Sequence, residues 1–205
     1  MNIGTHNSLT YLTPKKWWQK LIKFTAKCQE ENYEKQYELG ARVFDVRLWY
    51  DDDLESEVRH GRIAYKGGVD AFIGMLDFLE EKGDCYVRII CEEDFLAKND
   101  PLSIDKEKRF INMCRSFERA YKNIKFFGGN RKYDWKVLYN FENKDVPNLI
   151  DRYSSTTSLF KSDKKWLAVL DDLYPKLYAK LKNKQLIKEH NDKEGYLFID
   201  FINIR

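Results

Sequence analysis

Residues 40–49 read GARVFDVRLW, a run in which apolar and charged side chains alternate directly after a glycine. Alternation along a β-strand places Phe44, Val46 and Leu48 on one face. The opposite face carries Val43, Asp45, Arg47 and Trp49. An acid and an arginine two residues apart form either an ion pair on a solvated face or part of a functional site. The apolar surroundings indicate that both faces are covered, as in parallel sheets, and this favours a functional site.

Short apolar runs alternate with longer amphipathic segments on both sides of this strand, a pattern typical of an α/β fold. We expect strands at residues 2–6, 42–49, 57–60, 85–92, 135–141 and 196–202. We expect helices at residues 15–24, 26–39, 69–82, 105–122 and 164–184. Gly40 and Gly83 are the expected stop signals of the second and third helices. Residues 142–163 are polar and predict either a long loop or a short extra strand.

The composition is that of a globular chain with one domain over residues 1–205. Of the 205 residues, 43% are hydrophobic and 34% charged, which allows a sizeable core. The net charge of +3 is too small to indicate a nucleic-acid partner, and no obligate protein partner is evident. The four cysteines show no CxxC spacing and no histidine close in sequence, so the spacing predicts buried thiols rather than a zinc site.

Polar residues fall at or near the carboxyl ends of five predicted strands. These residues are His6, Arg47, His60, Glu92 and Asp200. In open α/β sheets and β/α barrels, catalytic residues collect at this end of the strands. We therefore expect these side chains to share one site.

Two histidines, an arginine and a buried acid suit the cleavage of a phosphodiester. One imidazole takes a proton from the attacking hydroxyl and the other gives a proton to the leaving oxygen. An arginine binds the phosphoryl oxygens and stabilises their developing charge. An acid behind the base fixes the tautomer of its imidazole. A lone histidine is more often structural, so this interpretation depends on the residues acting together.

Five stretches together carry a resemblance to a known family. They are GTHNS (4–8), ELGARVFDVRL (38–48), RHG (59–61), YVRIICEED (86–94) and LFIDFIN (197–203). In this order they resemble the X-type catalytic domain of phosphatidylinositol-specific phospholipases C. The resemblance is strongest over residues 3–94 and returns at 196–203. It implies a distorted (β/α) TIM barrel with the site at the carboxyl ends of the strands. The short chain leaves little room for eight full β/α units, so we expect a reduced barrel.

The resemblance also implies a role for each matching residue. His6 would be the general base that activates the inositol 2-hydroxyl, and Asp200 would orient it. Arg47 would bind the phosphate, with Asp45 in support, and His60 would be the general acid toward diacylglycerol. Attack by the neighbouring hydroxyl would then give diacylglycerol and a cyclic inositol phosphate.

A weaker match concerns the segment IDRY at residues 150–153. By this match, Asp151 and Tyr153 resemble residues that contact inositol in the bacterial enzymes. The alternative is an aspartate that caps a loop and a tyrosine that packs against the core.

The sequence departs from the bacterial pattern at Asn7, where those enzymes usually have aspartate. The calcium-dependent eukaryotic members have asparagine there, and Asn7, Asp45 and Glu92 could supply oxygen ligands to Ca²⁺. Arg47, however, occupies a position where the eukaryotic pattern has a metal-binding acid, and its charge would repel the ion. We therefore favour a metal-independent site without a cofactor, with Ca²⁺ as the alternative. Glu92 would add negative charge near the phosphate.

The segment TPKKWWQKLIKF at residues 13–24 predicts a short amphipathic helix. Its apolar residues recur at helical spacing and include Trp17 and Trp18, with lysines around them. Such a helix suits an anionic membrane surface, and bacterial members of the family carry a tryptophan-bearing helix at this place. The alternative is a helix that packs its apolar face on the barrel.

No signal peptide or membrane-spanning stretch is evident in the sequence. A cytoplasmic protein in peripheral contact with a phospholipid membrane is therefore the default expectation, with secretion left open.

Two other functions remain open on the sequence alone. A metal-dependent glycerophosphodiester phosphodiesterase uses a similar barrel and two histidines, but Arg47 argues against it. A catalytically impaired module that binds inositol lipids is the second alternative, because Asn7 and Glu92 depart from the metal-independent pattern.

Overall fold

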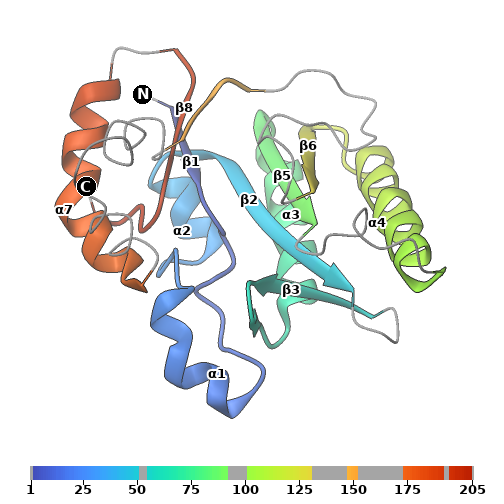
Figure 1. Cartoon of the computed structure of the whole chain (residues 1–205). Coiled ribbons are helices and arrows are strands. Elements are labelled where there is room, and N and C mark those ends of the chain that lie inside the picture. Colours follow the sequence, from blue (N-terminus) through green and yellow to red (C-terminus); the bar gives the residue numbers. More distant parts are fainter. Residues whose placement is uncertain are drawn as a thin grey trace.

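The computed structural model describes residues 2–50, 55–91, 101–130, 147–151, 173–191 and 194–204. A curled sheet of parallel strands forms its centre, open on one side as a half-barrel (Figure 1). The parallel strands lie in the order β7 (Leu149–Asp151), β8 (Tyr196–Ile199), β1 (Asn2–Thr5), β2 (Ala41–Tyr50), β5 (Cys85–Cys91) and β6 (Ile124–Asn130). Described helices lie between β1 and β2, between β2 and β5, between β5 and β6 and between β7 and β8 in the sequence, as expected of β/α units.

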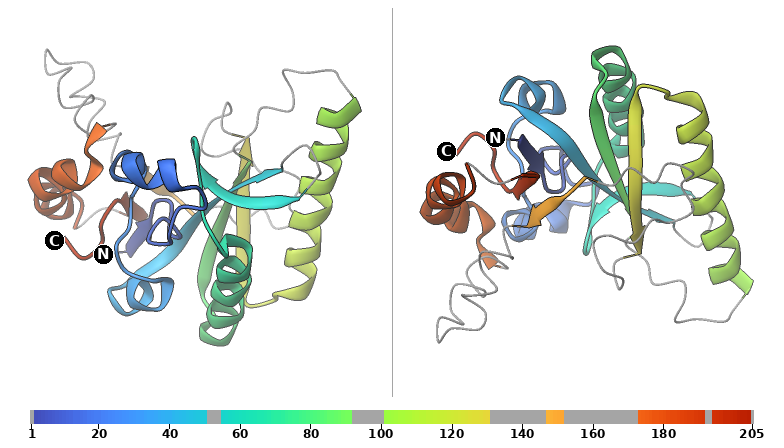
Figure 2. Two further views of the ribbon diagram at one scale, coloured as in Figure 1. Left: turned by 90° about the horizontal axis from the view of Figure 1, so that it is seen from below. Right: turned by 90° about the horizontal axis from the view of Figure 1, so that it is seen from above.

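Helices cover the outer face of this sheet (Figure 2). They are α2 (Tyr33–Glu38), α3 (Gly68–Lys82), α4 (Pro101–Ala120) and α7 (Pro175–His190). The main core lies between the sheet and these helices, where Phe44, Phe72 and Phe110 are fully buried. The inner face carries a smaller apolar cluster that includes Val43 and Phe198. The predicted division of the strand 42–49 into an apolar face and a charged face is therefore confirmed.

A hairpin and a short helix lie toward the carboxyl ends of the strands (Figure 1). The hairpin consists of β3 (Ser56–His60) and β4 (Ile63–Ala64), and β3 pairs antiparallel with β2. Leu48 lies opposite Val58, so the end of β3 is directed back along β2. The helix α1 (Trp17–Ile22) continues into a 3₁₀ turn, η1 (Lys23–Thr25).

The structure confirms the predicted α/β class and reduced barrel, but corrects several elements. The predicted helix 26–39 is helical only at α2, because the preceding residues run along the strand ends, where Gln29 is buried. The strand β6 was not predicted, whereas the predicted strand 135–141 lies outside the described residues. The alternative of a short extra strand within 142–163 is confirmed by β7.

The remaining corrections concern where elements end. The predicted helix 164–184 is described only from α7, which has Pro175 at its start and runs on to His190. The predicted strand 196–202 ends at Ile199, so Asp200 follows the strand. Gly40 and Gly83 follow α2 and α3 with φ values of 95° and 66°, which confirms both stop signals.

Candidate active site

The turn after β1 places His6 and is fixed to β2 through Asp45. The Asn7 backbone N–H donates to Asp45 Oδ2 at 3.0 Å, and the Ser8 N–H donates to the Asp45 carbonyl at 2.7 Å. The Asp45 N–H in turn donates to Ser8 Oγ at 3.0 Å. Asn7 has a φ of 47°, a left-handed conformation that asparagine tolerates better than most residues. The GTHNS motif is thus a tight turn whose shape depends on the neighbouring strand.

His6 lies between an acid and a guanidinium. Its Nδ1 is 2.9 Å from Asp200 Oδ1, and its Nε2 is 2.8 Å from Arg47 Nη2. A guanidinium only donates hydrogen bonds, so the Nε2 atom must be the acceptor. The proton of a neutral His6 therefore resides on Nδ1 and points at Asp200. This is the tautomer that a general base needs, with its lone pair on Nε2.

His60 reaches the same site from the hairpin. Its ring centroid is 5.9 Å from that of His6, with the two rings nearly perpendicular. The His60 Nδ1 atom is 2.8 Å from the Ala26 carbonyl oxygen, which can only accept. The proton on Nδ1 is thus committed to this hydrogen bond, and Nε2 is the atom available for proton transfer. His60 was predicted at a strand end, and it reaches His6 because β3 runs antiparallel to β2.

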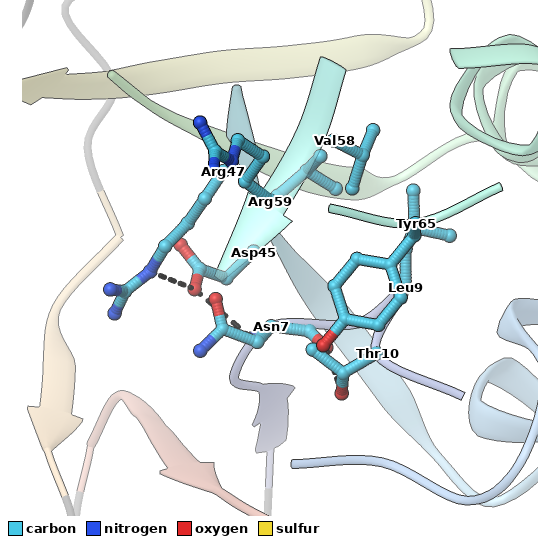
Figure 3. A pocket seen from close by; sticks show the side chains of 9 residues that line it. Asn7, Leu9, Thr10, Asp45, Arg47, Val58, Arg59 and Tyr65 are labelled. Carbon is cyan, nitrogen blue, oxygen red and sulfur yellow. Dashed lines mark hydrogen bonds and ion pairs between the residues drawn. The ribbon is translucent and has the colours of Figure 1, made fainter. Parts of the chain in front are cut away.

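Two arginines flank the Asp45 carboxylate, which is fully buried. Arg47 Nε lies 3.9 Å from Asp45 Oδ2, and Arg88 Nη1 lies 3.7 Å from Asp45 Oδ1. Figure 3 shows Arg47 extending past Asp45, with Asn7 on the other side of that carboxylate. The sequence analysis did not predict Arg88, because its position opposite Asp45 depends on the register between β2 and β5 and not on the alternation within either strand.

A small pocket lies beside this carboxylate (Figure 3). It is lined by Asn7, Leu9, Thr10, Asp45, Val46, Arg47, Val58, Arg59 and Tyr65. Arg59 comes from β3 and stacks over the Trp49 ring at 4.6 Å. The pocket therefore has cationic groups from two strands around a single buried acid.

Two further residues of the site follow α1 in the sequence and were not predicted. The Gln29 side chain donates to the carbonyls of His6 and Ile199 at 3.2 and 3.0 Å, and so joins the ends of β1 and β8. The Cys28 thiol lies 3.8 Å from His60 Nδ1, and the Asn7 amide donates to its sulfur at 3.5 Å. Neither residue has a local sequence signal, because both act through contacts with distant strands.

The other predicted site residues are only partly described. The Asn7 Nδ2 atom is 3.1 Å from His6 Nε2, which places Asn7 within the site. Asp151 ends β7 in register with Phe198, and only its backbone is described. Glu92 and Tyr153 lie outside the described residues. Trp17 and Trp18 of α1 are 74% and 39% exposed.

The described residues do not fit a calcium site. Asp45 is the acid that a Ca²⁺ ion would need, but the guanidinium groups of Arg47 and Arg88 both lie within 3.9 Å of its oxygens. A divalent cation there would face two fixed positive charges. In the described part of the chain, the only His, Cys, Asp and Glu side chains that approach closely enough to share an ion are those of His6, Cys28 and Asp200. That group is not the all-oxygen set that calcium prefers.

Solved structures of two bacterial enzymes match almost the whole chain. The phosphatidylinositol-specific phospholipase C from Listeria monocytogenes is 17% identical, with a TM-score of 0.55 over 98% of this chain and 87% of that chain. A mutant of the phosphatidylinositol-specific phospholipase C from Staphylococcus aureus is 15% identical, with a TM-score of 0.59 over 98% of this chain and 84% of that chain. The chain has the phospholipase C fold. No protein-family model and no curated protein sequence matches it.

Within this phospholipase C fold, the structure brings together residues that are far apart in the sequence. His6, Arg47, His60 and Asp200 converge near the carboxyl ends of β1, β2 and β8. The five sequence stretches that resembled the family thus predicted the correct fold. A further structure of the Staphylococcus aureus enzyme, with a TM-score of 0.54 and 14% identity over 97% of this chain and 85% of that chain, concerns the modulation of its membrane binding.

Proposed function

We propose that this protein is a phosphatidylinositol-specific phospholipase C-like enzyme that needs no metal ion. It would cleave the phosphodiester of phosphatidylinositol by attack of the inositol 2-hydroxyl and release diacylglycerol and a cyclic inositol phosphate. The observation that carries this proposal is the arrangement around His6, with Asp200 at Nδ1 and Arg47 at Nε2. The fold shared with bacterial phospholipases C supports the same conclusion.

The first step is proton removal by His6. The inositol hydroxyl takes the place of the Arg47 guanidinium at Nε2, and the guanidinium moves to the phosphoryl oxygens. His6 then accepts the hydroxyl proton and becomes an imidazolium, which the Asp200 carboxylate stabilises at 2.9 Å. The attacking oxygen and the phosphorus belong to one molecule, so the reaction gains from proximity.

The second step is proton donation to the leaving oxygen of diacylglycerol by His60. Its Nδ1 proton is held by the Ala26 carbonyl, so the Nε2 proton is transferred. The ring centroids of His6 and His60 are 5.9 Å apart, which allows one phosphate group to contact both. Arg47 stabilises the charge on the phosphoryl oxygens between these steps.

A membrane surface is the proposed location of the substrate. On α1 and η1, Trp17, Leu21 and Phe24 are all more than half exposed. Lysines at positions 15, 16, 20 and 23 surround these apolar residues and favour an anionic bilayer. The Phe24 ring stacks on Tyr174 at 5.5 Å, so the exposed apolar surface continues to α7, where Leu177 and Leu181 are also exposed. No helix among the described residues is long and apolar enough to cross a membrane.

A substrate panel with variants of the two histidines tests the proposed reaction. The purified protein is assayed on phosphatidylinositol, phosphatidylcholine and glycerophosphodiesters, each with and without EDTA. We expect cleavage of phosphatidylinositol alone. The His6→Ala and His60→Ala variants should each lose about 10²–10⁴-fold in rate, the usual contribution of a general acid or base.

Each alternative function gives its own result in this panel. A glycerophosphodiester phosphodiesterase would cleave the soluble diesters and lose activity in EDTA. A lipid-binding module would bind inositol-lipid vesicles and release no inositol phosphate. A near-normal rate in a folded His6→Ala variant would contradict the proposed role of His6.

A further inference from the structure

Three side chains with metal-binding atoms meet at the proposed base, and one of them is His6 itself. Ligand atoms of His6, Cys28 and Asp200 all lie within 4.8 Å of one another, and the three residues are buried. The Cys28 sulfur is also 3.8 Å from His60 Nδ1. A nitrogen, a sulfur and a carboxylate oxygen are the ligand types of protein zinc sites, and shifts of the side chains would bring them from these separations to zinc-binding distance. The proposed reaction gives the thiol no role.

The backbone holds Cys28 firmly in this position. Its N–H donates to Thr10 Oγ1 at 2.9 Å, in the turn that follows β1. Its carbonyl accepts from the Phe201 N–H at 2.6 Å, immediately after Asp200. The Cys28 backbone is thus fixed between the two segments that carry His6 and Asp200, and this holds the thiol close to both side chains.

Asn7 can supply a fourth ligand. It is 3% exposed, and its amide nitrogen lies 3.1 Å from His6 Nε2 and 3.5 Å from Cys28 Sγ. Its Oδ1 atom is buried without a hydrogen-bond partner. A half-turn of the amide presents this oxygen to the cluster in place of the nitrogen. A cluster of N, S and O ligands of this kind selects a borderline-soft ion and disfavours Ca²⁺ or Mg²⁺.

We propose that His6, Cys28 and Asp200 form a binding site for Zn²⁺ and that the bound ion switches the active site off. The Cys28 thiol releases its proton on binding, and the thiolate and the Asp200 carboxylate offset the charge of the ion. A neutral His6 carries its proton on Nδ1, so the ion takes up the Nε2 lone pair, and the Arg47 guanidinium, 2.8 Å from Nε2, moves away as it does for the inositol hydroxyl. With its lone pair bound to the ion, His6 can no longer accept the hydroxyl proton. The proposed binding of Zn²⁺ does not depend on the proposed function, whereas the proposed inhibition rests on it.

The spacing of residues in the sequence could not reveal this site. Its ligands come from positions 6, 28 and 200, and β1 and the segment before α2 meet the end of β8 only in the folded chain. The absence of a CxxC motif argues against a local zinc module and not against a site assembled from three segments.

Cobalt spectroscopy on the full chain tests the binding directly. Co²⁺ substitutes for Zn²⁺ and gives a thiolate-to-metal charge-transfer band only when a cysteine sulfur is a ligand. We expect this band in the wild type, its removal by one equivalent of Zn²⁺, and its loss in Cys28→Ser. Cys85→Ser is the matched control, because Cys85 is a buried thiol at the far end of β5, and burial raises its pKa to about 11.

Calorimetric titration with Zn²⁺ and with Ca²⁺ measures the affinities. Removal of an outer-shell partner weakens metal binding by about 10–100-fold, so loss of the Cys28 ligand should cost at least that factor. Ca²⁺ should not bind. The absence of a charge-transfer band in the wild type with Co²⁺ would overturn the proposed site, whatever the variants show. Equal Zn²⁺ affinity in Cys28→Ser and the wild type would also overturn it.

Inhibition is measured on phosphatidylinositol, with each variant compared with its own metal-free rate. We expect Zn²⁺ to inhibit the wild type and Cys85→Ser alike, to be reversed by EDTA, and to act about tenfold or more weakly on Cys28→Ser. If the band appears but the protein cleaves no phosphatidylinositol, the site stands and the proposed function fails. If the protein is active and the band is absent, only the zinc site fails.

Discussion

At the residue scale, the contact between His6 and Asp200 is the centre of the proposed chemistry. An Asp200→Asn variant keeps the shape of the side chain but cannot stabilise the imidazolium, and its amide can donate to Nδ1 and favour the wrong tautomer. We expect kcat to fall by about 10²–10⁴-fold. The measurement is the rate on a water-soluble phosphatidylinositol analogue, with folding checked by circular dichroism.

The matched control for this variant is Glu189→Gln, the same acid-to-amide change at an exposed position on α7. It should retain the wild-type rate. A folded Asp200→Asn protein with a rate within a few fold of the wild type would show that the acid does not support the base.

Arg88 lies deeper in the sheet and acts on stability through Asp45. Both side chains are buried, with an Arg88 Nη1 to Asp45 Oδ1 distance of 3.7 Å. Removal of one partner from a buried ion pair costs about 3–5 kcal/mol when the other charge is left without compensation. Arg47 and the Asn7 N–H still face Asp45, so we expect Arg88→Met to lower the free energy of unfolding, measured in urea, by less than about 3 kcal/mol.

A double-mutant cycle separates the ion pair from simple loss of packing. Addition of Asp45→Asn to Arg88→Met should cost less than the sum of the single changes, because the uncompensated charge is gone. Arg62→Met is the exposed control and should stay within about 0.5 kcal/mol of the wild type. Strict additivity of the two buried changes would contradict the account of this pair.

At the scale of the element, the short helix α1 buries too little of its apolar surface for packing to account for its two tryptophans. It spans only Trp17–Ile22, and the Trp17 side chain is 74% exposed. Replacement of Trp17 and Trp18 by alanine should weaken binding to vesicles that contain anionic lipid. The rate on a soluble substrate should not change. Vesicle sedimentation and the soluble assay measure the two effects separately.

The control for this prediction is Ile104→Ala, another exposed apolar residue, on α4. It should leave vesicle binding unchanged. An equal loss of activity on vesicles and on soluble substrate in the tryptophan variant would assign α1 a packing role instead.

The sequence predicted elements well where their pattern was local. The alternation in β2 and the glycine after α3 predicted the strand faces and the helix end correctly, because both features depend only on the local backbone geometry. The predicted helix at 26–39 was too long because Gln29 is held by the carbonyls of His6 and Ile199 and not by helical bonds. The strand β6, with the sequence IKFFGGN, was not predicted because glycine is uncommon within strands. In the structure Gly128 fits there because it has no Cβ atom, which lets the Ile89 backbone approach closely.

At the scale of the whole molecule, the half-barrel brings the site residues together from both ends of the chain. β1 pairs with β8, and this pairing sets His6 against Asp200 across 194 positions. A match to five motifs predicted the residues involved, but no periodicity could predict Arg88 behind Asp45 or Cys28 between the two histidines. Those contacts depend on strand register and on the path of the segment before α2.

The charges around Asp45 also predict how the activity of the whole protein responds to metal removal. In the proposed reaction, Arg47 and Arg88 would supply the positive charge that a calcium ion would otherwise bring to the phosphate. Dialysis against EDTA should therefore leave the rate on phosphatidylinositol unchanged, and added Ca²⁺ should not raise it. A loss of activity in EDTA that Ca²⁺ restores would assign the site to the metal-dependent mechanism.

The most direct measurement is the identity of the first product, followed by phosphorus-31 NMR with EDTA-treated protein and phosphatidylinositol vesicles. The proposed attack by the inositol 2-hydroxyl requires the resonance of a cyclic inositol phosphodiester to appear before that of any phosphomonoester. It should be absent with His6→Ala. An inositol monophosphate formed first without a cyclic precursor, or no phosphorus product at all from the folded protein, would contradict the account.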